Sequence, residues 1–256
     1  MFNDINPWFE TTLGAKVLQT ETAIIEQLLP GFFGYHLLQM SVQAQKLYES
    51  SPIRHKISYM PNHVDSDLYA SPEQLPFEED SLDVVLLHHM LDFHESPQNL
   101  LREVSRVSRP MGQLVIVGFN PFSLWGMCKP IAGMKGKQPW QGKFISPTRL
   151  MDWLNLLNFK IDIAQYSLYG LPYVRSKKSA KQELPDYSQG LSRNPNWPFG
   201  AIYVIVARKQ VGTMTQIRPV WNKTNRLAEL SVVRPTASRD VVARNFPSLP
   251  KKPTKE

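Results

Sequence analysis

Three apolar runs in the chain have the length of a buried β-strand and almost no polar interruption. They are Leu82–Leu87, Leu114–Val117 and Ala201–Ala207. A half-exposed strand alternates between polar and apolar residues, whereas a strand that is covered on both faces reads as a continuous apolar run. The pattern therefore predicts central strands of an α/β sheet, with Tyr35–Met40 as the first strand and Phe159–Ile163 as a later one.

Helices are predicted where apolar residues recur every three or four positions. One covers residues 16–29, a second begins at Ser96-Pro97, and a third covers Pro147–Leu157. Ser can cap a first turn, and Pro is tolerated there because its N–H would have no partner anyway. The second helix is expected to stop at 109–112, where Pro and Gly follow. Strand, helix and strand then form a right-handed unit, whose ligands bind beyond the carboxyl ends of the strands.

The segment Leu75–Phe119 combines several motifs in a fixed order. Leu-Pro-Phe at 75–77 and an acidic turn precede the strand, and the helix ends in Arg-Pro-x-Gly at 109–112. Together they resemble the second half of class I S-adenosylmethionine-dependent methyltransferases, in particular the group with Leu-Pro-Phe before the fourth strand. The resemblance implies a Rossmann-like doubly wound sheet, mostly parallel with an antiparallel last strand and helices on both faces. It extends over about 15–209, with 16–29 as an N-terminal lid helix.

The resemblance implies S-adenosylmethionine as the cofactor, but the positions that should hold it depart from the family's pattern. The turn after the first strand has no glycine, which normally lets the backbone approach the ligand. Asn62 replaces the acid that binds the ribose, and Ser71-Pro72 stands where an Asp often contacts the adenine. The predicted cofactor-binding residues are Met40, Ser41, Gln43, Asn62, Ser71, Pro72, Glu73, Leu75, His88 and His89. Two hypotheses follow: a methyltransferase acting on an unidentified acceptor, or a catalytically inactive methyltransferase-fold binding module.

A long segment at 120–146 follows the strand at 114–117 and is rich in aromatic residues and glycine. In the family, insertions at this point shape the pocket for the methyl acceptor. The candidate substrate-binding residues are Asn120, Phe122, Trp125 and Trp140. The alternative is a surface helix over Phe122–Lys135 whose aromatic side chains pack on the sheet. The acceptor itself stays open between an RNA base, a protein side chain, a lipid precursor and a small metabolite.

The histidines add a weak candidate for catalysis and no metal site. His88 follows the strand at the place where the methyl group and the acceptor meet in the family, so it is a candidate general base. Methyl transfer often needs only alignment, so no catalytic residue is assigned. His88, His89 and His94 lack the i, i+4 spacing of a zinc-binding helix and have no cysteine partner, so no metal is predicted. The absence of Gly-x-Gly-x-x-Gly excludes a nicotinamide dehydrogenase.

Charge is concentrated at the end of the chain. Residues 209–256 contain ten Lys or Arg and three Asp or Glu, which accounts for the net charge of +7 of all 256 residues. Residues 1–209 are predicted to form one α/β domain, and 210–256 a basic, Pro-containing, disordered tail. The tail is either an electrostatic arm for RNA, DNA or an acidic partner, or a solvated terminus that maintains solubility.

Location is predicted from cysteine usage and hydropathy. The single cysteine, Cys128, excludes an internal disulfide framework and favours a reducing compartment. The first residues lack the basic and apolar regions of a secretory signal. No apolar segment approaches the ~20 residues that span a bilayer. A cytoplasmic protein is therefore expected.

Overall fold

The structure is a computed structural model that describes residues 5–61, 66–133, 138–169 and 197–210. The chain divides into two compact units, residues 1–213 and 214–256, and every described residue belongs to the first. The predictions for Asn62 and for the tail beyond residue 210 lie outside the described residues. Within the described ranges, no helix combines the length and the apolar character that a membrane crossing requires.

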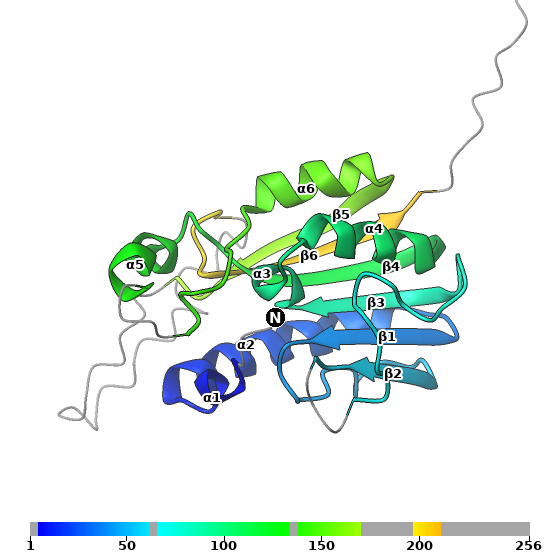
Figure 1. Ribbon diagram of the computed structural model, residues 1–256, viewed down its shortest axis with the longest axis horizontal. Coiled ribbons are helices and arrows are strands. Elements are labelled where there is room, and N and C mark those ends of the chain that lie inside the picture. The colour runs from blue at the N-terminus through cyan, green and yellow to red at the C-terminus, as the bar shows by residue number, and fades with distance from the viewer. Residues whose placement is uncertain (1–4, 62–65, 134–137, 170–196, 211–256) are drawn as a thin grey trace, which may run out of the picture. The chain divides into compact units, whose positions relative to one another are not determined.

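Six strands form a single sheet in the order β2-β1-β3-β4-β6-β5 (Figure 1). Strands β2, β1, β3 and β4 run parallel, and β6 is antiparallel to both of its neighbours, β4 and β5. This confirms the predicted Rossmann-like sheet with one reversed strand. The strands are β1 (His36–Ser41), β2 (His55–Tyr59), β3 (Leu82–His88), β4 (Ser108–Phe119), β5 (Phe159–Ser167) and β6 (Ile202–Lys209).

Successive residues of the central strands enter two different cores. On one face, Val85 packs with the apolar sides of α4 (Pro97–Val107) and α6 (Pro147–Leu156). On the other face, Leu86 packs with α2 (Thr12–Leu28). Because both faces are covered, the strands have no polar alternation, which is the pattern that the sequence predicted.

The N-terminal helix begins four residues earlier than the predicted start at residue 16. The Thr11 side chain accepts a hydrogen bond from the Gly14 N–H at 3.1 Å, and this cap starts α2 at Thr12. The helix ends at Leu28, and a 3-10 turn, η1 (Leu29–Gly31), continues it. The cap lies outside the apolar periodicity, so periodicity alone misplaced the boundary.

Two expectations for the helix predicted to begin at Ser96-Pro97, which is α4, are wrong in detail. Ser96 is the residue before α4, but its side chain makes no capping hydrogen bond. The helix ends at Val107 and not at 109–112, because β4 already begins at Ser108. The sequence Arg-Pro-Met-Gly is therefore part of the strand, where Met111 has a φ of 67°.

Three short or irregular elements lie beyond the carboxyl ends of the parallel strands. They are α1 (Asn6–Phe9), α3 (Met90–Phe93) and α5 (Leu124–Gly133), which Figure 1 shows at that end of the sheet. A third cluster of buried apolar side chains joins them to the strand ends, and its members include Ile5, Phe9, Phe119, Trp125 and Ile202. The carboxyl edge of the sheet is thus closed by the beginning of the chain and by the segment after β4.

Candidate functional site

The site lies at the point in the sheet where the order of successive strands reverses. From β1 the chain proceeds outward to β2, and from β3 it proceeds to β4 on the other side. The last residues of the two inner strands, Ser41 and His88, are direct partners in the parallel ladder. Doubly wound sheets bind their ligands outside the carboxyl ends of the strands at such a switch point.

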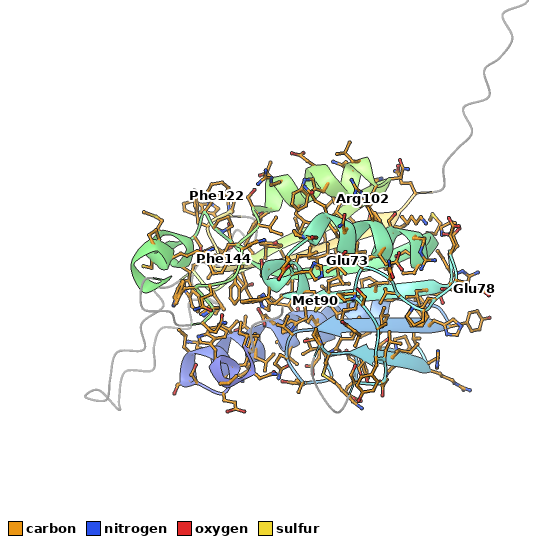
Figure 2. All side chains as sticks on the ribbon, in the orientation of Figure 1. Glu73, Glu78, Met90, Arg102, Phe122 and Phe144 are labelled. Atoms are coloured by element: carbon orange, nitrogen blue, oxygen red, sulfur yellow. The ribbon has the colours of Figure 1, made fainter. Side chains whose placement is uncertain are left out.

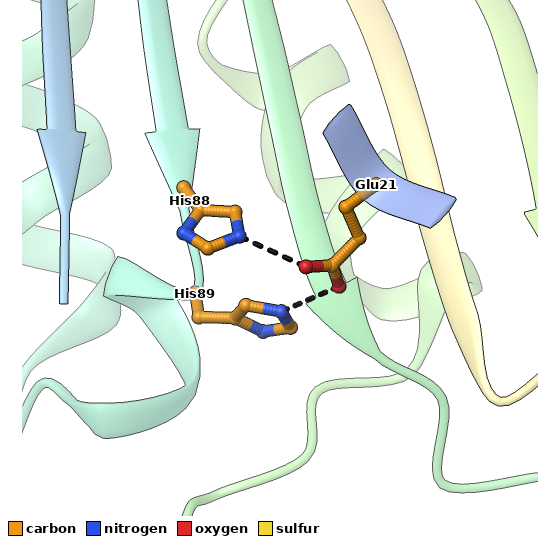
Figure 3. Close-up of side chains that lie close together, drawn as sticks. All are labelled: Glu21, His88 and His89. Carbon is orange, nitrogen blue, oxygen red and sulfur yellow. Dashed lines mark hydrogen bonds and ion pairs between the residues drawn. The ribbon is translucent and has the colours of Figure 1, made fainter. Parts of the chain in front are cut away.

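A buried carboxylate from the N-terminal helix meets two consecutive histidines at this point (Figure 3). Glu21 Oε2 lies 3.0 Å from His88 Nε2, and Glu21 Oε1 lies 2.8 Å from His89 Nε2. All three side chains are fully buried. The Glu21 carboxylate therefore connects α2 to the end of β3.

Each histidine has a second partner at its other ring nitrogen. His88 Nδ1 lies 3.0 Å from the Ser41 hydroxyl, which also accepts the Gln43 N–H at 3.0 Å. His89 Nδ1 lies 2.9 Å from Asp92 Oδ2, and that oxygen also accepts the Phe119 N–H at 2.9 Å. Both ring nitrogens of each histidine are engaged within the chain. In this conformation, therefore, neither histidine has a nitrogen available to take a proton from a methyl acceptor, which is the role predicted for His88.

Charge is shared unevenly in this network. Burial by itself raises the pKa of Glu21, but the His89 imidazolium and the hydrogen bonds from both rings outweigh it and lower this pKa to about 2. Burial lowers the pKa of His89, but the Glu21 and Asp92 carboxyl groups raise it to about 9. Burial lowers the pKa of His88 and raises that of Asp92. The pairing of Glu21 with His89 is therefore ionic, whereas His88 is held towards its neutral form.

Aromatic and aliphatic side chains separate the network from solvent. The Phe119 ring stacks on His89 with centroids 4.2 Å apart, and Phe9 of α1 lies 5.8 Å from His88 and 5.9 Å from His89. Ile5, just before α1, is also buried. The low dielectric of this surrounding strengthens the Glu21–His89 attraction.

The turn after β1 uses its own backbone donors. The Val42 N–H donates to the His88 carbonyl oxygen at 3.3 Å, and the Gln43 N–H donates to the Ser41 side chain. Met40 and Ser41 are fully buried, whereas Gln43 is half-buried. A turn does follow β1, but two of the amides that were predicted to face the cofactor are engaged within the chain.

The segment at 71–75 is tied to α4. The Leu75 N–H donates to Glu103 Oε1 at 2.7 Å, and both Leu75 and Pro72 are buried. Ser71 is exposed, and Glu73 lies 3.7 Å from the His94 ring that follows α3. Of the residues predicted to contact the cofactor here, only Ser71 and Glu73 present side chains that are not buried.

A carboxylate that was not predicted from the sequence lies beside the end of β2. Asp67 accepts hydrogen bonds from the Ser58 N–H at 2.8 Å and the Ser58 hydroxyl at 2.5 Å. The Ser58 hydroxyl lowers the pKa of Asp67, so this exposed group is charged. The family pattern places an acid directly at the strand end, whereas Asp67 comes eight residues after Tyr59 and returns by folding back. Glu21 and Asp92 were missed because neither belongs to a recognisable motif.

The segment after β4 contains the helix α5, as the surface-helix hypothesis expects, and its aromatic side chains differ in exposure. The Asn120 side chain donates to the Pro198 and Gly200 carbonyl oxygens and accepts the Phe122 N–H, so it holds the turn. Trp125 is buried in α5 and lies 5.9 Å from the half-buried Trp140. Phe122 is 62% exposed. Phe122 and Phe144 lie near α5, beyond the strand ends (Figure 2).

A cavity of about 440 Å³ lies beside this segment. It is found at the N-terminal ends of α4 and α6, and its lining includes basic and aromatic side chains. These are Lys143, Phe144, Arg149 and Trp153. The predicted acceptor segment therefore borders an open space, although Phe144 and not the four predicted residues lines it.

Comparison with known proteins agrees with this architecture. Residues 39–116, from within β1 to within β4, match the methyltransferase domain family. A SAM-dependent methyltransferase of Thermotoga maritima has the same fold, with a TM-score of 0.58 and 20% identity over 80% of this chain and 93% of that one. A SAM-dependent methyltransferase of Archaeoglobus fulgidus gives a TM-score of 0.54 and 17% identity, covering 75% and 94%. The fold is thus that of class I methyltransferases.

A protein of Escherichia coli (strain K12), the uncharacterized protein YafS, is 32% identical over 209 residues, which cover 80% of this chain and 81% of YafS. The matched domain and the fold together confirm the resemblance found in the sequence. The chain belongs to the class I S-adenosylmethionine-dependent methyltransferase family.

Proposed function

We propose that the chain transfers a methyl group from S-adenosylmethionine to an acceptor that is held near α5. The observation that carries the proposal is the switch point between β1 and β3, which lies inside the segment that matches the methyltransferase domain. When bound, S-adenosylmethionine supplies a methyl group on a positively charged sulfur. The protein's task is then to orient that group towards a nucleophile and to exclude water.

The residues around the switch point fit the chemistry of the cofactor. Asp67 is a charged, exposed carboxylate at the end of β2, and a carboxylate there accepts hydrogen bonds from ribose hydroxyls. We assign it the role that the sequence first gave to Asn62. Gln43, Ser71 and Glu73 offer polar side chains on the neighbouring turns.

The buried network supports this site by positioning it. Ser41 and His88 end the two inner strands, and Glu21 fixes both histidines against α2. Movement of α2 would therefore move the cofactor turn as well. For the acceptor, Phe122 and Trp140 are the predicted residues whose side chains are not fully buried.

Replacing Asp67 by asparagine is expected to weaken S-adenosylmethionine binding at least tenfold. Hydrogen bonds to a charged group contribute about 1.5–3 kcal/mol, and about 1.4 kcal/mol corresponds to a factor of ten. Calorimetric titration of the purified full chain with the cofactor and with its demethylated product measures the effect. Asp152→Asn, a change of the same type at an exposed position of α6, should leave the affinity unchanged.

Two results would count against the proposal at different levels. If the Asp67 and Asp152 variants bind S-adenosylmethionine with equal affinity, Asp67 is not part of the cofactor site. This result would not contradict the proposed methyl transfer. No heat with millimolar cofactor, in a protein that contains no co-purified ligand, would instead favour the inactive binding module. If binding is observed, methylation assays with RNA, protein, lipid and metabolite fractions would identify the methyl acceptor.

We also propose that the methyltransferase unit folds without the basic tail. The six strands and the helices that cover them all lie before residue 210. A chain that ends at residue 213 is expected to melt within about 4 °C of the full chain, which corresponds to roughly 1 kcal/mol for a unit of this size. A larger fall, measured by circular dichroism, would show that the tail contributes to the fold.

The electrostatic-arm hypothesis has a separate readout. If the tail contacts phosphates, the full chain should bind RNA more tightly than the truncated chain, and the difference should grow as the salt concentration falls. Fluorescence anisotropy with a labelled RNA at two salt concentrations measures this. Equal binding by both chains would leave the tail as a solvated terminus.

A further inference from the structure

Three potential metal ligands converge in the network that links α2 to β3. Glu21 offers carboxylate oxygens, and His88 and His89 both direct Nε2 towards them, with the donor atoms within 4.8 Å of one another. Zinc binds imidazole nitrogen and carboxylate oxygen at about 2.0–2.2 Å, so two ligands of a tetrahedral ion lie roughly 3.3–3.6 Å apart. The two Nε2 atoms lie 2.8 and 3.0 Å from the Glu21 oxygens, which are hydrogen-bond distances, so an ion would replace the shared protons and move the ligands apart by roughly 0.5 Å.

The backbone at His89 is what brings the two rings together. Successive residues of a strand point to opposite faces, so two adjacent histidines do not normally share a partner. His89 has a φ of 53°, in the left-handed region that non-glycine residues rarely occupy. This turn directs both imidazoles to the same carboxylate (Figure 3). Strain of this kind persists where the surrounding structure requires it and is concentrated at functional sites.

The outer hydrogen bonds are those of metal-binding histidines. A histidine that binds a metal through one nitrogen usually donates its other N–H to a carboxylate, a carbonyl or a similar acceptor, which fixes its orientation. Here His89 Nδ1 faces Asp92, and His88 Nδ1 faces the Ser41 hydroxyl. With both Nδ1 atoms engaged in this way, both Nε2 atoms face the Glu21 carboxylate.

The charge of the enclosed groups also suits a divalent cation. Glu21 and Asp92 are both fully buried carboxyl groups, and the apolar rings of Phe9 and Phe119 lie against His89. Lys129 and Tyr203 also interact electrostatically with Asp92. With both carboxylates ionised and both imidazoles neutral, an ion of charge +2 gives a neutral cluster.

We propose that Glu21, His88 and His89 bind a divalent transition-metal ion of the zinc type, with Asp92 and Ser41 as the groups that orient the two histidines. Sets of two imidazoles and one carboxylate bind zinc and ferrous iron. Because all the ligands are enclosed by α1 and Phe119, the ion is structural and fastens α2 to the ends of the strands. The proposal goes beyond methyl transfer and does not depend on it.

Metal analysis of the full chain tests the proposal. The protein is produced in zinc-supplemented medium, purified without chelators or a histidine tag, and measured by plasma mass spectrometry. We expect about one zinc per chain, and visible absorption of a nitrogen- and oxygen-ligated ion when cobalt is added to the stripped protein. Glu21→Gln should lower the affinity for both metals, and Asp92→Asn should lower it about 10–100-fold through His89.

Two controls make the result specific. Glu26→Gln changes an exposed residue of the same helix and should leave metal binding intact. His36→Gln with His55→Gln removes a histidine pair at the start of β1 and β2, whose Nδ1 atoms lie 2.7 Å apart, and should also leave it intact. Loss of the metal in that double variant would overturn the assignment. Wild-type protein that contains no metal and binds neither zinc nor cobalt at micromolar concentration would also overturn it, whether or not S-adenosylmethionine binds.

Discussion

Replacing Glu21 by alanine is expected to lower the free energy of unfolding by about 3–5 kcal/mol, the usual cost of removing one partner of a buried ion pair. The carboxylate is fully buried and bonds both histidines, so its removal leaves His89 with a buried charge whose remaining ionic partner among the described residues is Asp92. Because the side chain is fully buried, its removal is also expected to leave a void between α2 and β3. Urea denaturation followed by circular dichroism measures the loss.

Glu26→Ala provides the matched control for this change. It lies on the same helix and is exposed, so we expect it to alter the stability by no more than about 0.5 kcal/mol. If Glu21→Ala costs less than about 1 kcal/mol, the network does not fasten the helix to the sheet. Our proposal that the network holds the turn after β1 in position for the cofactor would then be wrong.

Phe119→Ala is expected to have an effect of similar size, about 3–5 kcal/mol, as for other fully buried aromatic residues. The ring is completely buried and stacks on His89 at 4.2 Å and on Phe144 at 5.1 Å. Its removal leaves a cavity beside the network and lets water approach the histidines. Thermal and urea denaturation measure the stability, and proton exchange at the His89 ring, followed by NMR, reports the access of water.

Phe122→Ala is the control from the same segment. This ring is 62% exposed, so its removal should change the stability by no more than about 0.5 kcal/mol. If Phe122 contributes to an acceptor pocket, the same variant should reduce methyl transfer while leaving the fold intact. Equal losses of stability in the two phenylalanine variants would contradict the arrangement around β4.

The central half of the fold could be predicted from local patterns. The apolar runs at Leu82–Leu87 and Leu114–Val117 lie in strands, as does Ala201–Ala207 apart from Ala201, which directly precedes β6. The periodic segments at 16–29 and 147–157 correspond closely to helices. These patterns suffice because burial on both faces of a parallel sheet directly requires apolar residues at consecutive positions. The Leu-Pro-Phe segment, the acidic turn and the Arg-Pro-x-Gly motif were together specific enough to indicate the methyltransferase family.

The groups that meet at the carboxyl edge of the sheet are brought together by packing between distant elements. Glu21 precedes His88 by 67 residues and resembles any other acid on an amphipathic helix until α2 packs across the sheet. Asp67 reaches the end of β2 by folding back onto Ser58, and the φ of His89 turns its ring towards Glu21. The sequence determined the sheet and its covering helices, because hydrophobic burial is encoded locally. The pairing of polar side chains depends on distances between elements that are far apart in the chain, and no local pattern contains them.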